Sequence, residues 1–186
     1  ASVICAPGRK GPLIYVEEPA VSTAEIIRQW VRKVGDISKA ADALVLVING
    51  RVMRKLCPNC RQPYKPSESQ LKALGMTSDK ATQFYRASGK IQVKNKIEEC
   101  AVCSGTGHLG QTGIYEVMAV SSAIRQHLAQ GDLKSALSQA RREKMIYIQE
   151  SALAKVVSGE TSLEEVGRVT AKKAKGNAPQ GKTTPA

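Results

Sequence analysis

A helix is predicted between residues 22 and 35 by the spacing of its apolar positions. Ser22 and Glu25 have the spacing of a capping box, in which side chains satisfy the free N–H groups at the start of a helix. Gly35 stands where a glycine commonly ends one. The apolar side chains between these signals fall on one helical face: Ile26, Ile27, Trp30, Val31 and Val34.

A second helical pattern follows directly. It starts at Asp36 and continues to Ile48, although its β-branched end is also compatible with a buried strand. Gly50 is expected to stop either element. We therefore predict two helices within residues 21–50, preceded by an extended N-terminal segment over residues 1–20.

Shorter elements are predicted in the middle of the chain. Two prolines, Pro63 and Pro66, interrupt regular structure. The caps and alternation after them predict a helix from Ser67 to Gly75 with Gln70 in its capping box, a helix over residues 79–88, and strands over residues 91–97 and 113–120.

From residue 121 onward the pattern is helical. Glycines and capping residues divide it into segments at 122–130, 133–143 and 148–157, and Thr161 with Glu164 has the spacing of another capping box. Short helices persist only when they pack on neighbours. We therefore expect a compact helical bundle over residues 121–170.

Four cysteines form two pairs with identical internal spacing: Cys57 with Cys60, and Cys100 with Cys103. Two residues between thiols allow a tight turn to direct both sulfurs at one ion, and four thiolates make a closed tetrahedron around zinc. Such a site has no open position for water or substrate. The pattern predicts a structural zinc ion rather than a catalytic one.

Other uses of these cysteines are less compatible with the pattern. Two disulfides would suit a secreted protein, and no signal peptide is visible at the start of the chain. A redox pair would need one such motif between a strand and a helix, whereas here there are two. His108 is close enough in sequence to compete for the metal, but we expect it in a solvated loop. Cys5 has no partner pair.

Two phosphate-related patterns are interpreted as coincidental. Glu17 and Glu18 end an apolar stretch that could imitate the Mg²⁺-binding strand of a nucleotide site, yet exposed glutamates at a strand end are common. Residues 176–183 satisfy the phosphate-loop pattern GxxxxGK[ST]. That loop requires a buried strand before it and a helix after it, but a lysine-rich segment precedes this one and a proline lies within it.

Charge adds one further candidate function. The net charge of +12 invites a nucleic-acid partner, but seven aromatic residues offer little for bases to stack on. Part of the excess lies in residues 171–186, which contain four lysines and no acid and are expected to form a disordered basic tail. We predict a solvated basic surface and no nucleic-acid binding. The longest apolar run, over residues 43–48, is too short to span a bilayer.

Together these patterns predict an α+β protein that is mainly α. We expect a small tetracysteine zinc subdomain with short strands over residues 51–120, packed against the bundle of short helices. Residues 21–50 are interpreted as a remnant of, or a link to, a larger domain. Because the chain starts at Ala1 rather than Met, we also expect a piece of something longer.

Three runs in a fixed order carry a family resemblance: RVMRKLCPNCRQPYKPS from residue 51, CAVCSGTGHLGQTGIYEVM from residue 100 and EKMIYIQESALAKVVSGETSLEEVGRVT from residue 143. Together they resemble the C-terminal region of the assembly ATPases of type II secretion and type IV pili, over about residues 36–170. Residues outside the cysteines also fall on the family's pattern: Arg51, Arg54, Leu56, Gly113, Tyr115, Glu116, Lys155, Gly159, Thr161, Glu165 and Arg168.

The resemblance implies a zinc module below a RecA-like ATPase core, with Cys57, Cys60, Cys100 and Cys103 as the metal ligands. It implies a cytoplasmic hexamer that uses ATP and Mg²⁺ in the parent protein and works on an inner-membrane platform protein. The chain itself is expected to lack ATPase activity, because no credible phosphate loop lies upstream of the cysteines. Departures occur where Gly50 and Gln111 replace the glutamine and arginine usual in the family, which puts contacts made by those side chains in doubt.

Two other classes remain as alternatives. CAVCSGTG matches one unit of the cysteine and glycine repeat of J-domain chaperones, which would make the chain a client-binding module, although that repeat normally recurs four times. A basic zinc ribbon that binds nucleic acid is the other, and salt-dependent binding to DNA or RNA would distinguish it.

Overall fold

The structure is a computed structural model, which describes residues 13–74, 76 and 83–170. The predicted α+β class is confirmed. In chain order the elements are α1 (Thr23–Val34), α2 (Ile37–Ala43), β1 (Leu46–Leu56), β2 (Gln62–Tyr64), α3 (Glu68–Ala73), β3 (Phe84–Arg86), β4 (Lys90–Val93), β5 (Lys96–Glu99), β6 (His108–Ala119), α4 (Ser122–Ala129), α5 (Leu133–Arg142), α6 (Ile148–Val157) and α7 (Leu163–Thr170).

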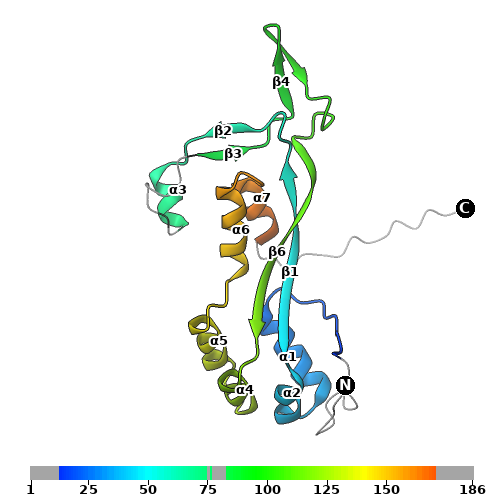
Figure 1. Cartoon of the computed structure of the whole chain (residues 1–186), viewed down its shortest axis with the longest axis vertical. Coiled ribbons are helices and arrows are strands. Elements are labelled where there is room, and N and C mark those ends of the chain that lie inside the picture. Colours follow the sequence, from blue (N-terminus) through cyan, green and yellow to red (C-terminus); the bar gives the residue numbers. More distant parts are fainter. Residues whose placement is uncertain (1–12, 75, 77–82, 171–186) are drawn as a thin grey trace, which may run out of the picture.

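Strands β1 and β6 form a long antiparallel hairpin, which is the axis of the molecule (Figure 1). The elements from β2 to β5 are inserted between its two strands. Its register runs from Leu46 opposite Ala119 to Leu56 opposite His108, with an irregularity after Arg54. Side chains alternate between the two faces of a strand, and one face of this pair is covered by helices. The buried face carries Val47, Asn49, Met53, Ile114, Glu116 and Met118.

The helices separate into two groups along this axis (Figure 1). Helices α1, α2, α4 and α5 gather at the end where β1 begins, whereas α6 and α7 cover its middle. The first group encloses the larger apolar core, which consists of Ile27, Ala41, Val47, Met118, Val120, Ile124, Leu128, Ala136, Ala140 and Met145. The second packs Ile148 and Ala152 against Met53 and Ile114. The residues after 121 thus contribute to both groups.

The predicted caps at the start of the chain are mostly present. The Ser22 hydroxyl accepts a hydrogen bond from the Glu25 N–H at 3.2 Å, and Gly35 takes the left-handed conformation that ends α1. Half of the predicted capping box is missing, because the Glu25 carboxylate accepts from the Val21 N–H instead. Asp36 caps α2.

The helix predicted from Asp36 ends at Ala43, and the alternative of a strand at its β-branched end is confirmed. Strand β1 begins at Leu46 and passes through Gly50, which was expected to stop it. In β1 buried and exposed side chains alternate, because the helices cover only one face of the β1–β6 hairpin. Gly50 fits inside the strand because the Tyr115 ring lies across it, about 3.0 Å from where a Cβ would stand.

Two predictions between the cysteine pairs need correction. The segment 91–97 is a hairpin rather than one strand, because Lys94 and Asn95 both take positive φ and reverse the chain. The helix predicted over 79–88 is wrong from Phe84 onward, where β3 pairs with β2. Residues 79–82 lie outside the described part. The capping box of Ser67 and Gln70 is present and starts α3.

At the start of the described chain, residues 13–20 form neither helix nor strand; Glu18 pairs with Lys33, and Glu17 is exposed. The predicted helices at 122–130, 133–143 and 148–157 are confirmed within a residue at their ends. The last helix is capped by Ser162, whose hydroxyl accepts from the Glu165 N–H, and not by Thr161. None of the helices in the described ranges has the length and hydropathy of a membrane-spanning segment.

Candidate metal centre

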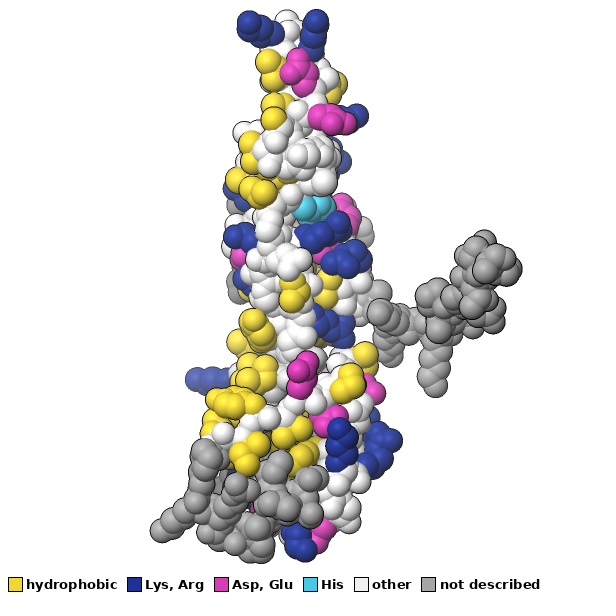
Figure 2. Space-filling model, turned by 90° about the vertical axis from the view of Figure 1, so that its right-hand side faces the viewer, with side chains coloured by type: hydrophobic (Ala, Val, Ile, Leu, Met, Phe, Trp, Pro, Cys, Tyr) yellow, Lys and Arg dark blue, Asp and Glu magenta, His cyan; other side chains and the backbone are white. Residues whose placement is uncertain are grey.

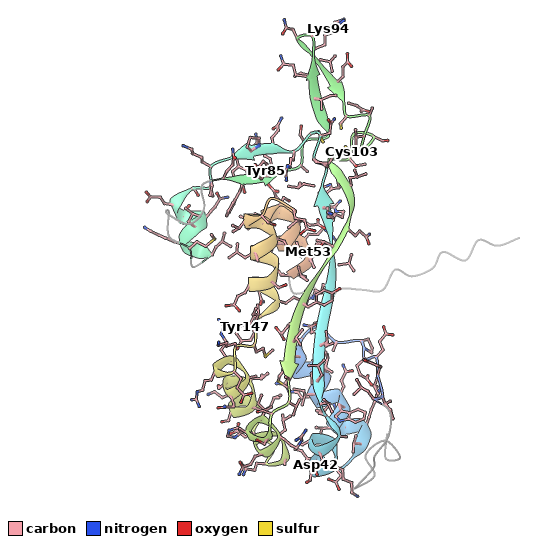
Figure 3. All side chains as sticks on the ribbon, viewed as in Figure 1. Asp42, Met53, Tyr85, Lys94, Cys103 and Tyr147 are labelled. Carbon is pink, nitrogen blue, oxygen red and sulfur yellow. The ribbon has the colours of Figure 1, made fainter. Side chains whose placement is uncertain are left out.

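The structure brings the four paired cysteines together at the end of the β1 and β6 hairpin (Figure 3). Cys57 and Cys60 follow β1, and Cys100 and Cys103 follow β5. All four are buried, and their sulfur atoms lie within 4.8 Å of one another. The fold thus brings the two cysteine pairs into contact, although they are far apart in sequence.

The spacing of the sulfurs fits a shared metal ion. The Cys57 and Cys100 sulfurs are 3.9 Å apart, and those of Cys60 and Cys103 are 3.6 Å apart. A tetrahedron with metal–sulfur bonds of about 2.3 Å has sulfur–sulfur edges of roughly 3.8 Å. A disulfide would require about 2.05 Å, and all four cysteines are free thiols. The four can therefore hold a metal ion, and four sulfur donors suit zinc or iron.

Backbone turns aim these sulfurs inward. In the first pair the Cys57 carbonyl accepts from the N–H groups of Cys60 and Arg61. In the second, the Gly105 N–H donates to the Cys100 carbonyl. Gly105 and Gly107 both have positive φ, a conformation that glycine adopts without strain. The glycines after Cys100 thus serve the turn that the motif requires.

Hydrogen bonds and burial set the ionisation of the thiols. The Asn59 amide donates to the Cys100 sulfur at 3.3 Å, and this bond, together with the backbone N–H groups of Val102 and Cys103, lowers the pKa of the Cys100 thiol to about 6. Burial raises the pKa of Cys60 to about 12. The Gly107 N–H donates to the Cys103 sulfur at 3.2 Å. A metal ion would supply the positive charge that four buried thiolates need.

The remaining sequence candidates lie elsewhere. His108 begins β6, where its Nδ1 lies 3.0 Å from the Thr106 carbonyl oxygen, and it is not among the grouped ligand atoms. Cys5 and the phosphate-loop pattern at residues 176–183 lie outside the described residues.

A buried carboxylate that was not predicted as a site ties α7 to the strand leading into the cysteines. Glu165 is 2% exposed and accepts bonds from the Arg54 guanidinium at 2.7 Å and from Arg168 Nε at 2.8 Å. Burial alone would raise the pKa of Glu165, but the hydrogen bonds from Arg168 and Arg54 outweigh it and hold the pKa below its usual value. The sequence gives Glu165 no role beyond its place on the family's pattern, because the predicted capping box pairs Thr161 with Glu164.

A second buried carboxylate joins the two helix groups. Glu116 on β6 accepts from the N–H of Thr23, at the start of α1, and from the N–H of Ile148, at the start of α6. The positive ends of both helix dipoles favour a carboxylate at this point. Glu116 was singled out only because it falls on a family pattern, and the structure shows why a long acceptor is useful there.

The two cysteine turns together with β4 and β5, residues 56–61 and 85–107, form a cysteine arm that also contacts the end of α6. Arg61, next to Cys60, donates to the Gly159 carbonyl at 2.6 Å and stacks over the Tyr85 ring at 4.3 Å. The Leu56 N–H donates to the Glu160 carbonyl at 2.9 Å. These contacts fix the metal centre relative to α6 and α7.

A model of the family described as "Type II/IV secretion system protein" matches residues 20–168, which include the cysteine cluster, the hairpin and both helix groups. The chain belongs to this family. The resemblance predicted from the cysteine and glycine motifs is therefore confirmed.

Three curated relatives are about one-third identical to this chain over the aligned regions. Type II secretion system protein E of Aeromonas hydrophila is 36% identical over 132 residues, 70% of this chain and 24% of its own length. Type II secretion system ATPase E of Vibrio cholerae is 32% identical over 130 residues, 70% and 24%. Type IV pilus assembly ATPase PilB of Pseudomonas aeruginosa is 31% identical over 152 residues, 80% and 25%. The chain spans about a quarter of the length of these relatives.

Proposed function

We propose that this chain is the C-terminal, zinc-stabilised part of an ATPase that powers type II secretion or type IV pilus assembly. The observation that carries the proposal is the convergence of four buried sulfurs within 4.8 Å in a chain that matches the secretion family over residues 20–168. The chain supplies a rigid accessory lobe, and the remainder of the parent protein supplies the chemistry.

The zinc ion has a structural role in this proposal. Four sulfurs complete a tetrahedral shell, which leaves no position for water or substrate. The apparent free energy of zinc binding in small finger peptides is about 10–16 kcal/mol, comparable to the stability of a whole domain. One ion is enough to order an arm that has few apolar residues of its own.

ATP and Mg²⁺ bind the parent protein and not this chain. The support is that relatives are named as ATPases, while the phosphate-loop pattern at residues 176–183 follows a lysine-rich sequence rather than the apolar run expected of a buried strand. By extension from the family, the parent is a hexamer at the cytoplasmic face of the inner membrane, where it drives a platform protein.

The outward face of the hairpin offers a surface for the ATPase core of the same protein. Its apolar side chains are between 43% and 57% exposed: Leu46, Ile48, Val52, Tyr115 and Val117. Figure 2, which views the side away from α6, shows hydrophobic side chains on the lower half of the surface. Contiguous exposed apolar surface marks interaction sites, and a two-stranded sheet is only marginally stable without further packing.

The proposal is tested by measuring metal and nucleotide on the same preparations. The chain purified without chelators is expected to contain one zinc per molecule by elemental analysis, and to show no Mg-ATP binding by calorimetry. Fusing it to the upstream reading frame of its gene should give ATP turnover that falls when Cys57 is changed to serine. Metal-free chain, or ATP turnover by the chain alone, would contradict the proposal.

A further inference from the structure

Asn59 lies inside the first cysteine pair, but its side chain contacts the second. Its amide nitrogen donates to the Cys100 sulfur at 3.3 Å. The two pairs are otherwise joined by contacts between cysteine sulfurs and by a backbone bond from the Cys57 N–H to the Gly107 carbonyl at 3.0 Å. Among the described side chains other than the cysteines, Asn59 is the one that donates to a ligand sulfur.

This contact is of the kind that tunes a metal site. Four thiolates around one divalent cation leave a net negative charge, which N–H donors to the sulfurs stabilise. The Gly107 N–H does this for Cys103 at 3.2 Å, but it belongs to the backbone and persists in any variant that keeps the turn. The Asn59 amide does the same for Cys100 from a side chain, and at the same time it bridges the two turns.

We propose that Asn59 is a positioning residue for the metal, whose amide holds the Cys100 sulfur in place and thereby increases the affinity of the site for zinc. The inference rests on the proposed zinc role of the cysteines. It extends that role to a residue that is not a ligand and that no part of the cysteine spacing identifies. Outer-shell partners of this kind typically contribute about 10- to 100-fold to metal affinity.

Asn59 can be replaced without disturbing a core. The residue is exposed and belongs to none of the buried apolar clusters. Asn59→Ala removes the donor, and Asn59→Asp keeps the shape but places a carboxylate beside the thiolate. Asn59→Gln retains an amide on a longer side chain. Gln62→Ala is a matched control, because this exposed amide two residues beyond Cys60 contacts Arg86 and no sulfur.

The experiment measures zinc affinity by competition with a chromophoric chelator at neutral pH, using zinc alone as the probe. We expect Asn59→Ala to bind one zinc about 10- to 100-fold more weakly than the natural sequence, Asn59→Asp to be at least as weak, Asn59→Gln to recover part of the loss, and Gln62→Ala to be unchanged. With cobalt in place of zinc, the sulfur-to-metal charge-transfer band should shift in Asn59→Ala but not in Gln62→Ala.

The outcomes separate the two proposals. If the natural sequence binds no zinc, the proposed zinc role fails. If it binds one zinc, but Asn59→Ala and Asn59→Asp bind within about twofold of it and leave the cobalt band unmoved, the zinc role stands and the positioning role of Asn59 is overturned.

Discussion

The two ends of the hairpin are ordered by different physics. At one end, α1, α2, α4 and α5 surround ten buried apolar residues. At the other, the buried cluster consists of the four cysteines, with Ile91 packed against it. Beyond the cysteines, β4 and β5 project with nearly all of their side chains exposed, and Lys94 lies at the tip (Figure 3).

One short chain thus combines an apolar core at one end with a region at the other end that has too few buried apolar residues to form such a core. Burying apolar area stabilises the first end at about 25 cal/mol per Å² without any cofactor. The second end has too little apolar area for that, so its order depends on ligand bonds. Metal removal should therefore disorder the residues around the cysteines, whereas a substitution in the apolar core should destabilise the helices around that core.

The largest effect is expected from metal removal. A zinc chelator, or Cys57→Ser, should remove an apparent stabilisation of about 10–16 kcal/mol and disorder residues 56–61 and 85–107, because the four sulfurs are the buried cluster there. Hydrogen exchange resolved by residue should show rapid exchange there. Residues 62–74 and Phe84 have apolar packing of their own, in which Leu71 and Phe84 form a buried cluster with Val156 of α6. Amides of α4 and α5 should remain protected, since their core contains no ligand. Uniform loss of protection at both ends would mean that the two regions form one cooperative unit.

The reciprocal test removes part of the apolar core. Met118 is fully buried between the helices, and Met118→Ala should reduce the free energy of unfolding by about 2–5 kcal/mol through lost burial and a cavity. Urea denaturation of the zinc-loaded protein measures this. Val117→Ala, one residue away on the exposed face, is the control and should change stability little. Weaker zinc binding by Met118→Ala would argue against independent ends.

A smaller effect should follow from the carboxylate that connects the regions. Glu165→Gln removes the charge that Arg54 and Arg168 share, and about 3 kcal/mol of stability should be lost. Because the folded pKa of Glu165 is lowered, its contribution is present above the unfolded pKa of about 4.3 and declines as the pH falls below it. Thermal melts from pH 7 to pH 3 should show a shallower acid-induced decline in the variant. Glu164→Gln, at an exposed neighbour, should melt like the natural sequence.

The local elements could largely be predicted from sequence because their signals are local. Asp36 and Ser67 cap helices where their spacing indicates. The cysteine pairs also meet as their spacing predicts. The caps depend on a few neighbouring residues, whereas the cysteine pairs are distant in sequence and could be matched because each pair has the spacing of a half-site for one metal ion.

The errors arose where distant partners decide the conformation. Ile48 continues a helical pattern, yet pairing with Val117 draws it into β1. Phe84 lies in a segment that looks helical, and its pairing with Tyr64 makes it a strand. The role of Glu165 could not be inferred either, because its partner Arg54 is far away in sequence.

The smallest predicted effect concerns the contact between the cysteine arm and α6. Gly159 has φ +72°, and a Cβ there would stand 2.8 Å from the Tyr85 ring and 3.1 Å from the Arg61 guanidinium. Gly159→Ala should therefore cost about 1–2 kcal/mol from the left-handed backbone, together with some displacement of the ring. Gly167→Ala is the matched control, since that glycine is helical with open space around it, and it should be neutral or slightly stabilising. If combining Gly159→Ala with Tyr85→Ala recovers part of the loss, the ring contact couples the arm to α6; if the two losses simply add, the ring contact does not couple them.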